Sequence, residues 1–152
     1  MQNIVYHGSN VEVPVPRVLQ NGFYKDFGYG FYCTNLEKQA KRWALTKKHG
    51  HVVNVYSYTK DDSLNTLVFN EMTDEWLDFV VDCRRGKTHN YDCVEGPMAD
   101  DTIWNYVDDF VRGLITREAF WELVKFKYPT HQIVFCTEES LKQLCFERSY
   151  SL

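Results

Sequence analysis

The chain has 152 residues, of which 44% are hydrophobic and 16% aromatic, so it can bury one core and is expected to form a single domain over residues 1–152. Seventeen basic and 21 acidic side chains give a net charge of −4, which provides no electrostatic basis for general nucleic-acid binding. No apolar run approaches the roughly 18 residues that span a bilayer, no signal peptide is visible, and the five cysteines form no Cys-x-x-Cys pair. These features predict a cytoplasmic protein with reduced thiols and no membrane association.

The first predicted element is a strand over residues 3–7, which ends in the motif Tyr6-His7-Gly8-Ser9. A histidine at a strand end, followed by a residue without a Cβ, places an imidazole beside backbone that a ligand can approach closely. Such a histidine is also common as a purely structural residue. The motif therefore becomes informative only in combination with motifs later in the chain.

The next informative segment is Asp26-Phe-Gly-Tyr-Gly-Phe-Tyr-Cys-Thr34. Gly28 and Gly30 allow a tight turn and a close approach of the backbone to a ligand. The four residues after Gly30 predict a short strand whose alternate side chains point to opposite faces, so that either Phe31 or Tyr32 faces a cleft while the other packs in the core. Taken alone, the segment also fits a hairpin with an aromatic core residue.

A helix is predicted immediately after this strand, over residues 35–47. Thr34 begins a capping-box pattern with Glu37 three residues later. Apolar residues then follow at helical spacing, namely Leu36, Ala40, Trp43 and Ala44. The pattern indicates a strand that leads directly into a helix.

Two strands and three helices are predicted in the centre of the chain. The strands cover residues 52–59 and 66–69, and the helices run from 73 to 85, from 103 to near Gly113, and from 116 to 127. We assign the aromatic stripes of these helices to the core rather than to a cofactor.

The last part of the chain predicts one strand and one helix. Pro129 ends the preceding helix, residues 132–137 form a strand, and a helix covers 138–146. Strands near both ends and helices between them indicate an α+β domain.

Taken in order, His-Gly-Ser near the amino terminus and Gly-x-Gly-Phe-Tyr-x-Thr before a helix resemble the first two signature motifs of the ADP-ribosyltransferase superfamily. The resemblance is closest to its His-Tyr-Glu branch, which includes diphtheria toxin and the poly(ADP-ribose) polymerases. It implies a split β-sheet with a helical central segment, and NAD as the substrate.

The same resemblance implies roles for individual residues. His7 would hydrogen-bond the ribose next to nicotinamide, the Gly8 backbone would hold the carboxamide, and Tyr32 would stack on the nicotinamide ring. Ser9 would assist at one of the two riboses. Gly30 would contribute to cofactor binding in the second motif, and Thr34 would brace that motif from outside.

These residue types suit the chemistry of NAD. Its nicotinamide is a pyridinium cation, which a tyrosine face attracts by about 0.5–2 kcal/mol. Cleavage of the glycosidic bond leaves an oxocarbenium-like ribose, as in glycosidases. The site must therefore stabilise positive charge on the sugar.

The third family motif is an acidic residue at the start of a late strand, and the matching residue in this chain is Gln132. An amide accepts a hydrogen bond from the ribose but supplies no full negative charge to the cation. A catalytic set of His7, Tyr32 and Gln132 would therefore lack the usual charge.

The segment 92–101 could supply a replacement acid. Val94-Glu95-Gly96-Pro97 predicts an ordered turn within it. The candidate acids are Asp92, Glu95, Asp100 and Asp101. The alternative for the last two is that they cap the following helix.

This segment, the Gly-Phe-Tyr-x-Thr motif and the late Gln-Ile-x-Phe strand also resemble, in the same order, a group of short bacterial ADP-ribosyltransferase-like proteins of largely unassigned function. The resemblance implies a toxin that a neighbouring protein partner neutralises.

Two clusters of basic residues are predicted to lie on solvent-exposed helix faces. The alternative is that they bind the NAD pyrophosphate or an anionic target. They are Lys38, Lys41, Arg42, Lys47, Lys48 and Arg84, Arg85, Lys87. His49-Gly-His51 has no further ligand at a familiar spacing, so no metal site is predicted.

The leading hypothesis is an NAD-dependent ADP-ribosyltransferase that releases nicotinamide and acts on an unidentified acceptor. Two alternatives stay open. One is a catalytically silent module that binds NAD, ADP-ribose or a protein, and the other is an NAD glycohydrolase in which water attacks.

Overall fold

Two β-sheets organise the computed structural model, which describes residues 3–20, 25–125 and 129–152. The three-stranded sheet has the order β1-β3-β7 and is antiparallel throughout. Its strands are β1 (Asn3–Ser9), β3 (Val52–Tyr58) and β7 (Leu144–Ser151).

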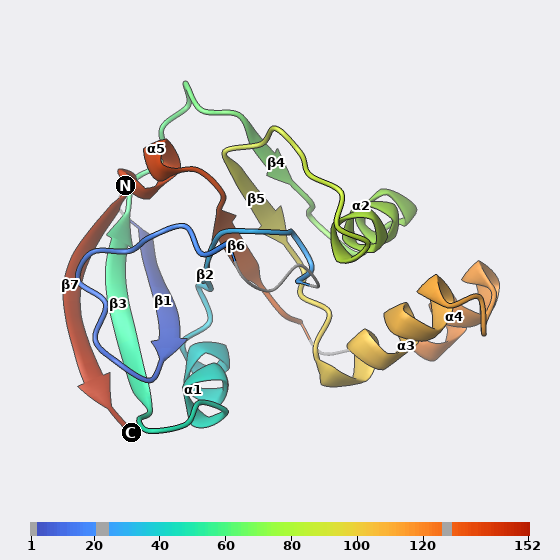
Figure 1. Ribbon diagram of the computed structural model, residues 1–152, viewed down its shortest axis with the longest axis horizontal. Helices are drawn as coiled ribbons and strands as arrows, with labels where there is room; N and C mark the ends of the chain where they lie inside the picture. Colours follow the sequence, from blue (N-terminus) through green and yellow to red (C-terminus); the bar gives the residue numbers. More distant parts are fainter. Residues whose placement is uncertain (1–2, 21–24, 126–128) are drawn as a thin grey trace.

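The four-stranded sheet has the order β2-β6-β5-β4, and β4 and β5 are its parallel pair. Its strands are β2 (Phe31–Cys33), β6 (Gln132–Phe135), β5 (Cys93–Gly96) and β4 (Thr66–Val68). Figure 1 shows the three-stranded sheet at one side of the molecule, the four-stranded sheet in the middle and most of the helices at the other side. The predicted α+β class is confirmed.

A short antiparallel bridge joins the two sheets. Tyr6 in β1 and Thr34, directly after β2, exchange backbone hydrogen bonds: the Tyr6 N–H donates to Thr34 O at 2.8 Å, and the Thr34 N–H donates to Tyr6 O at 2.9 Å. The motifs that contain His7 and Tyr32 are thereby held next to each other although 25 residues separate these two positions in the chain.

Five helices complete the described part of the chain. They are α1 (Glu37–Leu45), α2 (Asp74–Arg84), α3 (Asp101–Val111), α4 (Arg117–Leu123) and α5 (Glu138–Leu141). Thr73 and Thr116 cap α2 and α4 through their side chains. Gly86 and Gly113 follow α2 and α3 with φ of 89° and 74°, which suits glycine and ends a helix. The helix predictions that begin at 73 and 103 are confirmed. The helix predicted over 116–127 is confirmed as far as Leu123, where α4 ends, and residues 126 and 127 lie outside the described residues.

The four-stranded sheet is buried on both faces. On one face, Val94 and Val134 pack against helix residues such as Trp76 of α2 and Phe120 of α4. On the other face, Phe31 and Ile133 pack with Tyr56 of the three-stranded sheet. Because successive side chains of a strand point to opposite faces, Tyr32 lies on the helix side of the sheet and Phe31 between the two sheets.

Helix α1 lies directly on β1, and Gly8 makes this possible. A Cβ at Gly8 would stand 2.4 Å from the backbone oxygen of Ala40 and 2.6 Å from the backbone nitrogen of Ala44. These distances are shorter than any side chain tolerates, and both atoms are helix backbone. The glycine therefore sets how closely α1 approaches β1.

The predicted carboxyl-terminal helix over 138–146 is wrong beyond its first turn. Helix α5 ends at Leu141, and residues from Leu144 onward form β7, which pairs with β3. A register shift in this pairing between Val55 and Tyr56 interrupts the alternation of buried and exposed side chains along β7. The two-residue period that identifies a strand is consequently weak in the sequence.

Two local predictions are also wrong. Val94-Glu95-Gly96-Pro97 does not form a turn, because its first three residues belong to β5, where Gly96 allows Phe69 to pack against the backbone. Thr34 does not cap α1, because both of its backbone groups are bonded to Tyr6 in the bridge and the helix begins three residues later. The Thr34 hydroxyl accepts instead from the Leu36 N–H at 3.0 Å. Among the described residues, no helix is long and apolar enough to cross a membrane.

Candidate functional site

A cavity of about 360 Å³ lies where the two sheets meet. Four of the residues predicted from the sequence line it, namely His7 and Gly8 of β1, Tyr32 of β2 and Gln132 of β6. The other lining residues are Lys25, Asp26, Trp43, Lys47, Met98, Ala99 and Trp104. Motifs far apart in the sequence thus contribute to one site.

His7 is a neutral imidazole with a defined tautomer. Its Nδ1 lies 2.6 Å from Tyr32 O, and because a carbonyl oxygen can only accept, Nδ1 carries the proton. Burial, together with the positive charges of Lys47 and Lys25, lowers the pKa of His7 from 6.5 to about 4. The ring stacks on Phe31 with centroids 4.1 Å apart. Its Nε2 is therefore an unprotonated acceptor at neutral pH.

The Gly8 backbone is oriented toward the cavity. In an antiparallel ladder, alternate residues direct their amide groups to opposite sides of the strand. Tyr6 directs its N–H and C=O away from β3 to Thr34, so Gly8, two residues later, directs its own to the same side. Gly8 thus offers a donor and an acceptor without a side chain between them and a ligand.

Tyr32 presents its ring at the cavity while its hydroxyl is anchored elsewhere. The hydroxyl donates to Gly28 O at 2.5 Å and accepts from the Phe27 N–H at 3.2 Å. Burial raises the pKa of Tyr32 well above its ordinary value, and the Asp26 charge acts in the same direction, so the hydroxyl stays protonated. The Lys25 ammonium lies 4.8 Å from the ring centre. The ring face is therefore already in contact with a cation.

Trp43 is a site residue that the sequence analysis assigned to the apolar face of a helix. It lies on α1, which Gly8 holds close to β1, and it lines the same cavity as Tyr32. Aromatic side chains from β2 and from α1 thus border the same cavity. The position of Trp43, eleven residues after Tyr32 and within the second turn of the following helix, was the available signal.

Gln132 is 2% exposed at the start of β6. Its Nε2 donates to Asp26 Oδ2 at 3.1 Å and to Pro97 O at 3.4 Å. Both partners are acceptors, which fixes the orientation of the amide.

Asp26 supplies the cavity with a carboxylate that the sequence analysis did not single out. It is 6% exposed and accepts from the Ala99 N–H at 2.7 Å as well as from Gln132. Its other oxygen accepts from Arg84, through Nε at 3.1 Å and through Nη2. Asp26 stands at the start of the glycine-rich motif, and only this position in the sequence could have indicated it.

The prediction that Arg84 belongs to a solvated helix face is wrong. Its side chain is 5% exposed and forms an ion pair with Asp26. The guanidinium also lies over Trp104, 3.0 Å from the ring centre. Burial lowers the pKa of Arg84 while the Asp26 charge raises it. Asp26 thus contributes to the cavity wall as one member of a buried ion pair, and Arg84 lies behind it.

Three of the four candidate acids in the segment 92–101 are engaged outside the cavity. Asp92 accepts from the Asn65 N–H and from the Thr137 hydroxyl. Glu95 contacts His131 Nε2 at 2.7 Å. Asp100 caps α3 by accepting from the backbone N–H groups of Thr102 and Ile103, as the alternative proposed. For Asp101, only its place as the first residue of α3 is described.

The remaining predicted residues lie close to the cavity without lining it. The Ser9 hydroxyl accepts from the Val11 N–H at 3.3 Å in the turn after β1. Thr34 is buried in the bridge between the sheets. Gly30 packs against β6, where a Cβ would stand 2.5 Å from Val134 Cγ1. The structure therefore gives these three residues supporting positions.

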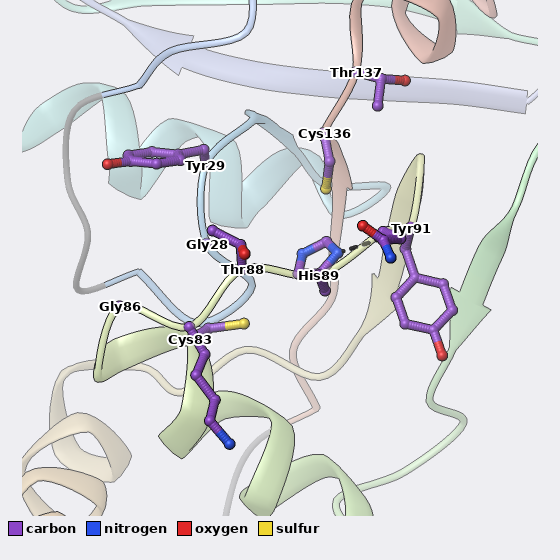
Figure 2. Close-up of a pocket in the computed structure, with 11 residues that line it drawn as sticks. Gly28, Tyr29, Cys83, Gly86, Thr88, His89, Tyr91, Cys136 and Thr137 are labelled. Atoms are coloured by element: carbon purple, nitrogen blue, oxygen red, sulfur yellow. Dashed lines mark hydrogen bonds between the residues drawn. The ribbon is translucent and has the colours of Figure 1, made fainter.

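A second cavity, of about 320 Å³, is lined in part by Gly28 and Tyr29, in the glycine-rich segment before β2 (Figure 2). Its histidine, His89, uses both ring nitrogens: Nε2 donates to Phe27 O at 3.0 Å, and Nδ1 accepts from the Tyr91 N–H at 3.2 Å. Figure 2 shows the Cys83 and Cys136 sulfur atoms facing this cavity.

Burial raises the pKa of Cys83 to about 12 and also raises the pKa of Cys136 well above its ordinary value, so both thiols stay protonated. The described residues that line this cavity consequently provide neither a free imidazole nor a thiolate, and we assign the candidate site to the first cavity. In the described ranges, no three His, Cys, Asp or Glu side chains are grouped so that they could hold a metal ion.

Among curated proteins, none is similar enough to this chain to count as a match. One family model does match, over residues 3–146, a range that includes every residue lining the candidate site. The chain therefore belongs to the family described as "Protein of unknown function (DUF3990)".

Proposed function

We propose that the chain is an NAD-dependent ADP-ribosyltransferase with an ADP-ribosyltransferase-like split sheet. One observation carries the proposal: His7, Gly8, Tyr32 and Gln132, which come from three strands, line a single cavity. The two sheets joined at the Tyr6–Thr34 bridge support the proposed fold.

The nicotinamide would bind between Tyr32 and Trp43. Both are aromatic and border the same cavity, and a pyridinium gains about 0.5–2 kcal/mol on an aromatic face. A carboxamide has a donor and an acceptor, which match the C=O and N–H of the Gly8 backbone. The nicotinamide end of NAD would then be held by two rings and one backbone residue.

The ribose would bind between His7 and Gln132. Because His7 is neutral, its Nε2 accepts a hydrogen bond from a ribose hydroxyl. The bond between the ribose carbon and the nicotinamide nitrogen breaks, and nicotinamide leaves as a neutral molecule with the electron pair. A nucleophile on the acceptor then bonds to that carbon and loses its proton.

A catalytically silent binding module is the second candidate, and the Asp26–Arg84 pair favours it. Of the described residues that line the cavity, Asp26 is the only carboxylate, and Arg84 neutralises it. A site without net negative charge binds ADP-ribose well but stabilises an oxocarbenium ion poorly.

The test is an incubation of the purified chain with NAD that carries a label on its ADP-ribose part, in the presence of bacterial lysate. Release of nicotinamide with label retained on macromolecules is expected for a transferase. Release without retained label would replace transfer by hydrolysis of NAD. Binding of NAD with no release would favour the silent module and contradict the proposal.

The proposal includes a toxin that a protein partner neutralises. Expression of the chain without a partner should then impair bacterial growth, and Tyr32→Ala should relieve the impairment. Equal growth of cells with either version would contradict the toxin role. Circular dichroism of both proteins controls for unfolding of the variant.

A further inference from the structure

The amide of Gln132 is oriented by its surroundings rather than by chance. Its nitrogen donates to Asp26 Oδ2 and to Pro97 O, which accounts for both N–H groups. Among the described residues, the buried side-chain nitrogen and oxygen atoms that lack a partner are Thr66 Oγ1 and Arg84 Nη1. No described residue donates to Gln132 Oε1. Because this oxygen has no such partner and yet is not one of the buried unpartnered atoms, it is accessible, and it faces the cavity that Gln132 lines.

Asp26 is held in place from three directions. The Ala99 N–H and the Gln132 amide donate to Oδ2, and Arg84 donates to Oδ1. Arg84 in turn is fixed between Asp26 and the Trp104 ring. The carboxylate cannot rotate without leaving a buried donor unpaired, which is costly.

We propose that Asp26 is the positioning residue of this site: it binds the amide nitrogen of Gln132 and so presents Gln132 Oε1 to the cavity as an acceptor for a ribose hydroxyl. The inference rests on the proposed function for the identity of the ligand. In this arrangement the carboxylate of a His-Tyr-Glu site is replaced by two residues. Gln132 provides the acceptor, and Asp26, one hydrogen bond behind it, provides the charge that orients it.

The arrangement also explains why a glutamate would not suit position 132 in this chain. Its carboxylate would stand about where the Gln132 nitrogen lies, 3.1 Å from Asp26 Oδ2. Two carboxylates at this separation cannot both be ionised, so one of them would hold a proton. The site therefore accommodates one ionised carboxylate, either at position 26 or at position 132, but not both.

Three variants of the full chain test whether the carboxylate can be moved from position 26 to position 132: Asp26→Asn, Gln132→Glu and the double variant. The three side chains at positions 26, 84 and 132 are together neutral in the wild type and in the double variant, and they carry an extra positive charge in Asp26→Asn. In Gln132→Glu they are neutral while the two carboxylates share a proton and gain a negative charge when that proton is lost. In Asp26→Asn, the new amide nitrogen faces Gln132, whose amide must flip and turn its N–H groups to the cavity. In the double variant, the new amide nitrogen at position 26 donates to the new carboxylate at position 132, which again presents an oxygen to the cavity. The longer bond to Pro97 is lost, and so is the bond from the Ala99 N–H, as it is in Asp26→Asn alone.

Binding of ADP-ribose and NAD, measured by calorimetry at a temperature where each variant is folded, is the deciding readout. Asp26→Asn should lower the affinity for ADP-ribose at least tenfold, and the double variant should restore it to within a few-fold of the wild type. Gln132→Glu should lose thermal stability as the pH rises, because its shared proton is then removed. A folded Asp26→Asn variant with wild-type affinity, or a double variant that binds no better than Asp26→Asn, would overturn the inference.

The matched control is Gln143→Glu combined with Asp26→Asn. Gln143 is also a buried glutamine, 7% exposed, and its amide nitrogen donates to Ser140 O, away from the cavity. Gln143→Glu should not restore binding to Asp26→Asn, and restoration there would overturn the inference. Nicotinamide release by the wild type is measured in parallel: if none occurs, the proposed transferase fails, while the binding results still decide the role of Asp26.

Discussion

The Lys25 ammonium lies over the Tyr32 ring, 4.8 Å from its centre, and both residues line the candidate site. The protein thus places its own cation where the proposed function requires the pyridinium of NAD. An incoming nicotinamide must compete with Lys25 for this aromatic face, whereas ADP-ribose, which has no pyridinium, does not.

Replacement of Lys25 by Gln should therefore change the ratio of two affinities. Affinity for NAD should rise relative to affinity for ADP-ribose by roughly two- to thirtyfold, which corresponds to a cation–π contribution of about 0.5–2 kcal/mol. Because both ligands carry the same pyrophosphate, any lost attraction between Lys25 and phosphate cancels in the ratio. Titration calorimetry with the two ligands measures it, and an unchanged ratio would contradict nicotinamide binding at Tyr32.

His7 should make stability depend on pH in a defined direction. The pKa of His7 is about 4 in the folded chain and about 6.5 when unfolded. Between these values the unfolded chain binds a proton that the folded chain does not, so stability falls as the pH decreases from 7 toward 4, by at most about 3 kcal/mol. Urea unfolding of the wild type and of His7→Asn at several pH values isolates this contribution. The free-energy difference between them should shrink as the pH falls.

His7→Asn should also weaken NAD binding about tenfold, in line with the loss of one hydrogen bond of roughly 1.5 kcal/mol. The Asn amide can still donate to Tyr32 O but leaves no acceptor in the position of Nε2. His51 provides the matched control, since its Nδ1 donates to Ala44 O at 2.9 Å and it does not line the cavity. His51→Asn should leave NAD affinity unchanged.

Trp43 and the Tyr32 hydroxyl should affect different properties. Trp43→Leu removes an aromatic face and should weaken NAD binding more than ADP-ribose binding. Tyr32→Phe keeps the ring but removes hydrogen bonds to Gly28 and Phe27, so it should cost about 1–2 kcal/mol of stability with little change in the affinity ratio. Trp121→Leu, on α4 and away from the cavity, is the control for loss of a half-buried tryptophan. If Trp43→Leu binds NAD like the wild type, the two-ring site is wrong.

Gly8→Ala should displace α1. Its Cβ would meet the backbone of Ala40 and Ala44 at 2.4 and 2.6 Å, so the helix must move, at a cost of about 1–3 kcal/mol or more. Because α1 carries Trp43, NAD binding should fall together with stability. Ser9→Ala, one residue later, should change neither measurably. Thermal unfolding and calorimetry on the two variants provide the comparison, and a Gly8→Ala variant as stable as the wild type would contradict this account of α1.

How far the sequence predicts the site depends on whether a residue belongs to a local motif. His7, Gly8 and Tyr32 stand in short motifs next to predicted strands, and Gln132 begins a predicted strand, so their convergence could be anticipated. Asp26 could not be identified in this way, because its role depends on Arg84, a residue 58 positions away whose burial no local pattern indicates. Helical periodicity assigned Trp43 to an apolar helix face but could not show that this part of the face borders a cavity.

The fold, too, contains elements that a local sequence pattern predicts and elements that it does not. Helix α2 has a regular period and strand β3 is rich in β-branched and aromatic residues, so both were predicted nearly to their ends, whereas β7 was predicted as a helix as far as Phe146. The register shift leaves one extra residue, Glu147, in β7 and so alters the alternation that would have identified this strand. Gly96 and Pro97 are typical of a turn, but Gly96 serves instead to admit Phe69 against β5. Long-range pairing and close contacts decide these cases, and neither is visible in a short stretch of sequence.

The place of β3 in the middle of its sheet has a consequence for how the chain folds. Its residue Val52 pairs with Ser9 on one side and with Ser151 on the other, so its two neighbours come from opposite ends of the chain. Contacts of such separation require large loops to close before they add stability, and they slow folding. During synthesis, β3 and β1 leave the ribosome long before β7, so until β7 is made, β3 has one open edge that can pair with another chain.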